Sequence, residues 1–282
     1  MSNFKNVPLV AVINDLSSFG KCSLAAALPL FAALNVQACP LPTAVLSCQT
    51  GFDGYYIKDL SECWAGYARC WQKMGVEFDA IVSGFFADAE QVKKAREFIK
   101  NFKKEKTTIV VDPVLGDGGK TYDTVDQALK NEMSLLVDTC DVATPNLTEL
   151  CLLCQKNYDQ VVAKHADADY FDFLYGLCRT VIDKGCKNLV VTGVKYGKNI
   201  CNIIADKNGY KITKSPYYGV NLSGAGDILT TIVTAKVLNG KSVFAAAKYA
   251  DSFLTKCIKD TVKHDIDRNH GINFEKYLKT LK

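Results

Sequence analysis

The regular alternation of two kinds of segment is the feature that most restricts how this chain can fold. Short apolar runs rich in β-branched residues recur at 8–14, 78–82, 107–111, 141–144 and 188–192, with helical patterns between them. The run at 107–111, TTIVV, lacks polar alternation, which is typical of a strand buried on both faces. Strands that alternate with helices indicate βαβ units, so we expect an α/β fold with a mostly parallel central sheet covered on both faces.

The helical patterns cover residues 23–34, 58–74, 88–102, 224–238 and 243–259, and residues 36–46 are predicted to be extended. Residues 200–212 interrupt the alternation, because Asp206-Lys-Asn-Gly209 lies between two apolar stretches and its Asn-Gly pair favours the tip of a hairpin. An antiparallel pair is therefore expected at one edge of the sheet. No linker or repeat divides the 282 residues, so the simplest interpretation is a single three-layer αβα domain over 1–282.

Composition argues against several other classes of protein. Apolar residues make up 48% and charged residues 23% of the chain, as in an ordinary folded domain. The formal charge of +4 gives no reason to expect nucleic acid or a membrane surface as a partner. No apolar run reaches the roughly 18 residues of a membrane helix, and no secretory signal is recognisable at the start. These observations predict a cytoplasmic protein.

Twelve cysteines are spread along the chain without the spacing of a disulfide framework. The CxxC pair Cys151 and Cys154 lies in an apolar stretch and has no second pair near it. Free cysteine packs as a small hydrophobic residue, so buried free thiols in a reducing compartment are predicted.

Polar and acidic residues follow the predicted strands at their carboxyl ends, where open α/β sheets bind ligands. They are Asn14-Asp15, Asp112-Pro-Val-Leu-Gly-Asp117, Thr144-Pro-Asn146 with Glu149, and Thr192-Gly193. Carboxylates in such a site are typical Mg²⁺ ligands near phosphates. The structural alternatives are a simple turn at Asp112-Pro113 and a helix capping box formed by Asn146 and Glu149.

The strongest single motif is Ser223-Gly-Ala-Gly-Asp227, which precedes an apolar helical pattern. Glycines let backbone amides approach a ligand closely, and a helix N-terminus adds unpaired N–H groups, so the motif predicts an anion hole for a phosphoryl group. Asp227 could accept a proton from a substrate hydroxyl. The alternative is an ordinary helix start, with Ser223 as cap and Asp227 as a first-turn acid.

Three other motifs do not support a function. Residues 116–121 resemble the end of a Walker A loop, but Val114 occupies a required glycine position, and no G-x-G-x-x-G follows the first strand. His264, Asp265, Asp267 and His270 lack a standard metal-ligand spacing.

Taken together, the motifs resemble the pyridoxal kinase family of the ribokinase-like superfamily. The resemblance runs from about residue 10 to about residue 254. It rests on Gly224-Ala-Gly-Asp227, Asp112-Pro-Val-Leu-Gly-Asp117, Thr144-Pro-Asn-Leu-Thr-Glu149, Gln49-Thr-Gly-Phe52 and Ser83-Gly-Phe85.

This resemblance implies a ribokinase-like fold and ATP-dependent phosphorylation of the 5′-hydroxyl of pyridoxal, pyridoxamine or pyridoxine, in a homodimer. It implies Asp227 as base, an anion hole of Gly224, Ala225 and Gly226, and ATP contacts from Asn146, Thr192, Gly193 and Ser223. Asp117 and Glu149 would serve Mg²⁺, and Asp112, Thr144 and Thr192 a monovalent cation such as K⁺ or Na⁺. Asp15, Thr50 and Phe85 would line the vitamin pocket.

The sequence departs from that family at the substrate end. Asp15, Phe85 and Gln49 stand where the family usually has Ser, Tyr and His. An acid at Asp15 resembles the hydroxymethylpyrimidine kinases of thiamine synthesis, which are therefore one alternative. A non-catalytic vitamin or nucleotide binder with the same fold is another. The paired glycines in 118–122 further predict a flap that closes on nucleotide.

Overall fold

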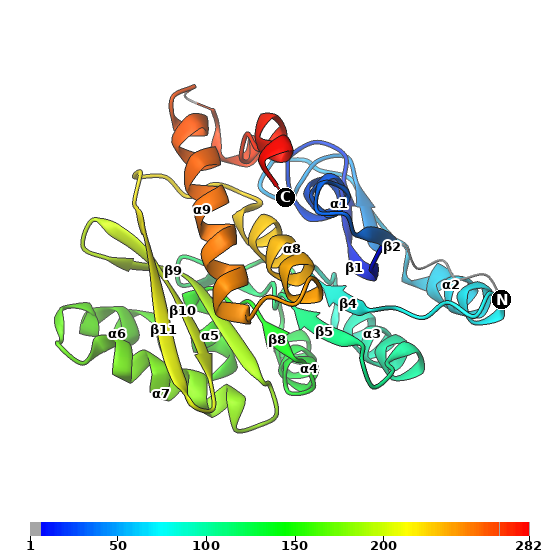
Figure 1. Cartoon of the computed structure of the whole chain (residues 1–282), viewed down its shortest axis with the longest axis horizontal. Helices are drawn as coiled ribbons and strands as arrows, with labels where there is room; N and C mark the ends of the chain where they lie inside the picture. The colour runs from blue at the N-terminus through cyan, green and yellow to red at the C-terminus, as the bar shows by residue number, and fades with distance from the viewer. Residues whose placement is uncertain (1–6, 265, 282) are drawn as a thin grey trace.

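The protein is described by a computed structural model over residues 7–264 and 266–281, and within these a nine-stranded sheet forms the centre (Figure 1). Its order is β11-β10-β9-β8-β5-β4-β1-β2-β3. The strands are β1 (Leu9–Ser17), β2 (Gln37–Leu46), β3 (Ile57–Asp59), β4 (Ala80–Ser83), β5 (Thr108–Val111), β8 (Val142–Ala143), β9 (Asn188–Tyr196), β10 (Asn199–Asp206) and β11 (Gly209–Pro216). β6 (Gly116–Asp117) and β7 (Lys120–Thr121) form a separate two-stranded pair.

The sheet is parallel from β2 through β1, β4, β5 and β8 to β9, as predicted. β10 pairs antiparallel with both β9 and β11, so the predicted edge hairpin is confirmed. Pro40 and Pro42 are tolerated within β2 because its outer neighbour, β3, pairs only with residues 44–46.

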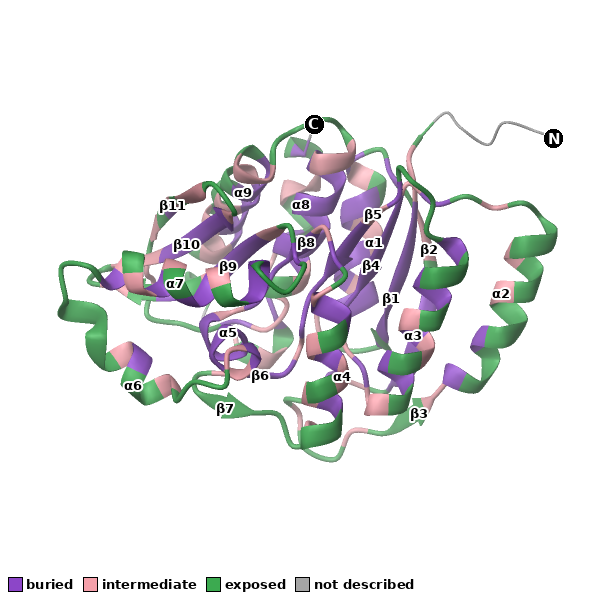
Figure 2. Cartoon of the chain, turned by 90° about the horizontal axis from the view of Figure 1, so that it is seen from below, coloured by how far each residue is buried: buried purple, intermediate pink, exposed green. Residues whose placement is uncertain are grey.

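Two layers of helices cover the sheet (Figures 1 and 2). One layer consists of α1 (Ser23–Ala33), α8 (Ala225–Leu238) and α9 (Val243–Val262), and the other includes α3 (Ala89–Phe102), α4 (Gln127–Val137), α5 (Leu147–Leu153) and α7 (Tyr170–Ile182). Each layer encloses its own hydrophobic cluster. Within β5, Ile109 and Val111 face one cluster and Val110 the other, which is why these three successive residues are apolar. The three-layer αβα prediction is confirmed.

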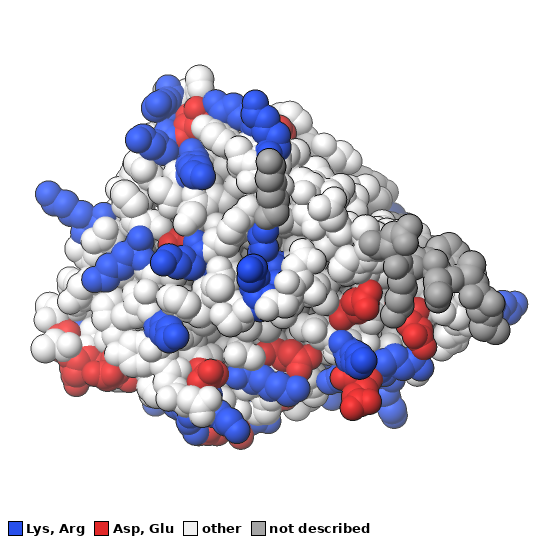
Figure 3. Space-filling view, in the orientation of Figure 1, with Lys and Arg blue, Asp and Glu red and all other residues white. Residues whose placement is uncertain are grey.

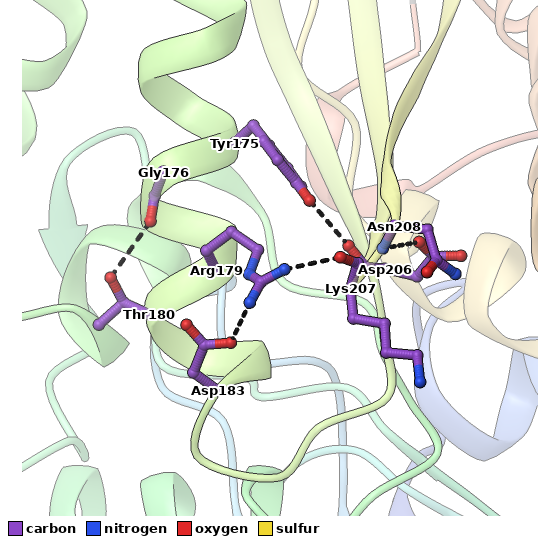
Figure 4. Close-up of polar contacts among 8 residues, drawn as sticks. All are labelled: Tyr175, Gly176, Arg179, Thr180, Asp183, Asp206, Lys207 and Asn208. Atoms are coloured by element: carbon purple, nitrogen blue, oxygen red, sulfur yellow. Dashed lines mark hydrogen bonds and ion pairs between the residues drawn. The ribbon is translucent and has the colours of Figure 1, made fainter.

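The edge hairpin is fastened to α7 at its tip (Figure 4). The Tyr175 hydroxyl donates to the Asp206 carbonyl at 3.1 Å, and the Arg179 guanidinium donates to the Lys207 carbonyl at 2.7 Å. The expected Asn-Gly tip is wrong by one position. Lys207 and Asn208 form the two-residue loop, and Gly209, with φ 149°, already pairs with Asp206 in the ladder.

The helix expected over 58–74 is shorter than predicted. Residues 57–59 form β3 and 61–63 a single 3₁₀ turn, so α2 spans Trp64–Lys73. Trp64 is its buried residue, while the ring of Trp71 packs edge-on against Phe78 at 5.4 Å. The predicted helix was too long because it began in residues of the edge strand β3, and an apolar residue is buried equally well in a strand or in a helix.

Another helix of the described chain, α6, covers Tyr158–Ala163.

Positive and negative side chains are interspersed over much of the face in Figure 3, with a group of Lys and Arg at its upper end. Across residues 7–264 and 266–281, the helices are too short or too polar to cross a bilayer.

The described cysteines carry free thiols. Cys151 is buried and Cys154 half-buried, and burial raises their pKa values to about 12 and about 11. The prediction of a buried free thiol is confirmed for Cys151, while Cys154 is only partly buried.

Candidate active site

A cavity of about 830 Å³ opens at the carboxyl ends of the parallel strands. Every site residue predicted from the sequence lines it. They are Asp15, Thr50, Phe85, Asp112, Asp117, Thr144, Asn146, Glu149, Thr192, Gly193, Ser223, Gly224, Ala225, Gly226 and Asp227. Residues separated by more than 200 positions meet here because parallel strands end at one edge of the sheet.

The start of α8 forms part of the cavity wall, and its N-cap is Gly224 rather than Ser223. The alternative in which Ser223 caps the helix is therefore wrong. Gly224 has φ 83°, and a Cβ atom there would lie 2.0 Å from the Lys21 carbonyl oxygen. No side chain caps the helix. In the described chain, the N–H groups of Ala225 and Gly226 have no hydrogen-bond acceptor, so they are available to an anion.

Asp227 lies in the first turn of α8 and accepts a hydrogen bond from Asn14, which lies within β1. Asn14 donates from Nδ2 to Asp227 Oδ1 at 3.1 Å, while Asn14 Oδ1 accepts from the backbone N–H of Phe85 at 2.8 Å. Burial raises the pKa of Asp227 to about 6, opposed by hydrogen bonds from the Ser23 N–H and from Asn14. A carboxylate with this pKa is largely ionised at neutral pH and can accept a proton.

Asp112, at the end of β5, is buried next to this carboxylate. It accepts from the Thr230 hydroxyl at 3.2 Å, and that hydroxyl lies 2.7 Å from the hydroxyl of Thr144. Burial and the charge of Asp227 together raise the pKa of Asp112 to about 8. No basic side chain forms an ion pair with Asp112 among the residues described.

Glu149 forms the helix capping box with Asn146 that was the structural alternative to a ligand-binding role. Its carboxylate accepts from the N–H of Asn146 at 2.7 Å and of Leu115 at 3.1 Å, and Asn146 Oδ1 accepts from the Glu149 N–H at 3.0 Å. This is a capping box at the start of α5. Both residues also line the cavity, so the capping role and a ligand-binding role are compatible. Burial raises the pKa of Glu149 above its usual range.

The loop between β6 and β7 contains the segment predicted to be a flap. Gly118 and Gly119 both have positive φ, and Asp117 Oδ1 accepts from the Gly118 N–H at 2.8 Å. The Gly119 N–H donates to the Thr148 hydroxyl at 2.9 Å, so the hairpin is attached to α5. Its closure on nucleotide stays a prediction.

The cavity is lined by far more acidic than basic side chains. Seven lining residues are acidic and two are basic in the described chain: Asp15, Asp112, Asp117, Asp123, Glu149, Asp227 and Asp251 against Lys195 and Arg268. A polyphosphate entering such a cavity needs added positive charge. The oxygen-rich set of Asp112, Asp117 and Glu149 fits a hard divalent cation, although the described residues do not form a compact cluster of three metal-binding side chains.

The burial of Asp112 next to the charge of Asp227 leads to a prediction about stability. Because its pKa is raised to about 8 in the folded protein, the folded state binds its proton more tightly than the unfolded state does. The contribution of this group to stability therefore falls as pH rises from about 4 to 8. We expect Asp112→Asn to raise the metal-free Tm at pH 7.5 by about 3 °C or more, and less at pH 5. Equal Tm changes at both pH values, measured beside exposed Asp53→Asn, would contradict this.

The end of the cavity around Gln49 and Thr50 includes a segment that the sequence analysis did not use. Residues 267–271 pack on the loop after β2: Gln49 Nε2 donates to the Asn269 carbonyl at 3.1 Å, and Asn269 Nδ2 donates to the Gly51 carbonyl at 2.7 Å. The rings of Phe19, Phe52 and His270 contact one another at 5.3–5.7 Å. His270 is thus part of an aromatic cluster. Asp265, considered with it in the sequence, lies outside the described residues.

At the other end, β9 and β10 contribute residues around Gly193. The Gly193 N–H donates to Asn202 Oδ1 at 3.2 Å, and Asn202 Nδ2 donates to Asp251 Oδ1 at 3.4 Å. Asn202 and Asp251 both line the cavity. Asn14, Thr230, Asn202, Asp251 and Asn269 were not predicted as site residues. Of these, Asn14 had been noted at the end of the first predicted strand, but without a role in the site.

Comparison with known proteins agrees with this geometry. The profile described as Phosphomethylpyrimidine kinase matches residues 20–273. The chain belongs to this kinase family. A candidate phosphomethylpyrimidine kinase of Bacteroides thetaiotaomicron VPI-5482 is 33% identical, with a TM-score of 0.93 over 100% of this chain and 96% of that one. A second crystal form of it, with pyridoxal, has a TM-score of 0.91 at 33% identity, over 98% and 96%.

Other proteins that are similar to this chain are pyridoxal kinases. The pyridoxal kinase PdxY of Histophilus somni is 26% identical over 197 residues, which cover 65% of this chain but only 63% of the relative's length. The pyridoxal kinase of Lactobacillus plantarum, 24% identical, shares the fold with a TM-score of 0.86 over 98% of this chain and 97% of that one. The predicted resemblance to the pyridoxal kinase family and its ribokinase-like fold is confirmed.

Proposed function

We propose that the protein transfers the γ-phosphoryl group of ATP to the 5′-hydroxymethyl group of pyridoxal, pyridoxamine or pyridoxine. The observation that carries this proposal is the position of Asp227. Its carboxylate accepts a hydrogen bond from Asn14 and lies in the first turn of a helix whose first residues line the cavity. The form of the Bacteroides relative with pyridoxal supports the substrate class.

Each part of the cavity then has a distinct task in phosphoryl transfer, which depends mainly on positioning and charge stabilisation. Asp227 accepts the proton of the attacking hydroxyl, and the N–H groups of Gly224, Ala225 and Gly226 stabilise the transferred phosphoryl group. Asn146, Thr192, Gly193 and Ser223 contact the nucleotide. Thr50 and Phe85 hold the substrate ring, since an aromatic side chain can stack on a flat ring.

Cations would act at the acidic part of the same cavity. Asp117, Glu149 and Asp112 would hold Mg²⁺, which neutralises phosphate charge when bound. Asp112, Thr144 and Thr192 would surround K⁺ or Na⁺. The buried hydroxyls of Thr144 and Thr230 beside Asp112 supply the neutral oxygen atoms that such an ion needs.

An assay of ADP release tests the proposal directly. The purified protein with Mg²⁺ and ATP should release ADP when a B6 vitamer is added, and should release little without one. ADP release with hydroxymethylpyrimidine alone would favour the related kinase activity, which the acid at Asp15 also fits. Binding of vitamer and nucleotide without any ADP release would instead support a non-catalytic binder.

The pKa of Asp227 leads to a prediction about pH. Only the ionised carboxylate can accept the substrate proton, so kcat/KM should fall about tenfold per unit below pH 6. Asn14→Ala removes a donor that favours the ionised form, and the inflection should then move to higher pH. A pH profile of kcat/KM for both proteins measures this, and an unchanged inflection in the variant would count against Asn14 as the orienting residue.

A further inference from the structure

A second carboxylate lies beside the proposed base, at the substrate end of the cavity. Asp15 is 4% exposed, and its Oδ2 accepts from the Ser17 hydroxyl at 2.8 Å. The Ser23 side chain favours the ionised form of Asp15, and the Ser23 N–H favours that of Asp227, by lowering the pKa of each carboxyl group. Ser23 therefore lies near both carboxylates, and its φ of 50° shows that the backbone adopts a left-handed conformation there.

Other contacts place the same two groups together. The Asn14 side chain accepts from the Asp15 N–H at 3.0 Å and donates to Asp227 at 3.1 Å. Burial raises the pKa of the Cys22 thiol, and the charges of Asp227 and Asp15 raise it further. Both carboxylates therefore act on the same thiol.

The negative charge of Asp15 is not balanced by the protein. The hydroxyl that donates to it, that of Ser17, is neutral, and none of the ion pairs in the described chain includes Asp15. A buried carboxylate without a cationic partner is costly. Because Asp15 lines the cavity, the group that can compensate it is a substrate group that donates hydrogen bonds or carries positive charge.

Substrate chemistry matches two neighbouring carboxylates. In pyridoxamine, the aminomethyl group is attached to the ring carbon next to the one that carries the 5′-hydroxymethyl group. In hydroxymethylpyrimidine, an amino group occupies the equivalent neighbouring position. A hydroxymethyl group directed at Asp227 therefore brings an N–H donor close to Asp15. Pyridoxal has an aldehyde at this position, whose oxygen only accepts hydrogen bonds, and pyridoxine has a neutral hydroxymethyl group.

We infer that Asp15 selects substrates with an amino group adjacent to the phosphorylated hydroxymethyl group, so that pyridoxamine is preferred over pyridoxine and pyridoxal. This inference rests on the function proposed above and specifies its substrate class. Asp15 acts as a specificity-determining residue through a charge-assisted hydrogen bond, which is stronger than a bond between neutral groups.

The test compares kcat/KM for pyridoxamine, pyridoxine, pyridoxal and hydroxymethylpyrimidine in the wild-type protein, Asp15→Asn and Asp15→Ser. We expect the wild-type protein to favour pyridoxamine over pyridoxine by about tenfold or more, since sites built around a substrate N–H reject analogues that lack it. Both variants should lose most of this ratio while they retain turnover of pyridoxine. Calorimetric binding of pyridoxamine without nucleotide should weaken in parallel. Asp53→Asn, an exposed carboxylate outside the cavity lining, is the matched control.

Each outcome is decisive. An equal loss for pyridoxamine and pyridoxine in Asp15→Asn, or a wild-type preference for pyridoxine or pyridoxal, would overturn the inference but leave the kinase function intact. Absence of ADP release with every vitamer would reject the proposed B6 kinase function. If only hydroxymethylpyrimidine is turned over, a loss of its turnover in Asp15→Asn but not in Asp53→Asn supports recognition of the amino group. Unchanged turnover in Asp15→Asn overturns the inference.

Discussion

Replacing Asp227 with asparagine is expected to lower kcat by about 10²–10⁴-fold, the usual contribution of a general base. The asparagine can still accept the hydrogen bond from Asn14 through its carbonyl oxygen, and it fits the space of the carboxylate. The loss should therefore appear in turnover, while ATP binding and Tm stay close to the wild-type values.

Three measurements are needed for this prediction. Steady-state ADP release gives kcat, calorimetry with a non-hydrolysable ATP analogue gives binding, and a thermal melt monitors the fold. Asp53→Asn controls for the loss of one carboxylate elsewhere, because that side chain is exposed and outside the cavity lining. Turnover of Asp227→Asn within a fewfold of the wild-type value would remove Asp227 from the role of base.

Gly224→Ala is expected to damage both the fold and the activity. The new Cβ would lie 2.0 Å from the Lys21 carbonyl oxygen, which is backbone and cannot rotate away, and the residue has φ 83°. Left-handed strain and overpacking together suggest a loss of about 3 kcal/mol, or about 10 °C in Tm. The start of α8 would also shift, so the N–H groups of the anion hole would be misplaced and ADP release should fall sharply.

Gly240→Ala separates the two causes. Gly240 has φ 80°, close to that of Gly224, but a Cβ there would meet nothing within 4 Å. Its Tm should fall by only about 3 °C, the part due to backbone strain, with ADP release preserved. Equal Tm losses in both variants would show that contact with Lys21 contributes nothing.

Much of the fold could be predicted from the sequence because its signals are local. The TTIVV run identified a central strand, since its three successive apolar residues, Ile109, Val110 and Val111, are buried on alternate faces of the sheet. The segment before Gly209 predicted the edge hairpin, because the residues that form a turn are neighbours in the sequence. The segment at 58–74 was misassigned in part, because β3 is only three residues long, too short to show the alternation of a strand, and it pairs with residues 44–46.

The candidate site was predictable where residues directly follow strands, since the carboxyl ends of parallel strands meet by geometry alone. Asp15 and Asp112 were found in this way, and Asp227 was found through the glycine motif that precedes a helical pattern. Sequence could not reveal that Asn14 donates to Asp227, or that Asn269 donates to the Gly51 carbonyl. Those contacts join residues 213 and 218 positions apart, and no local pattern encodes them. The chain alone determined which groups are available for chemistry. Tertiary packing decided which of them are buried together without a counter-charge, because desolvation depends on every element around the cavity.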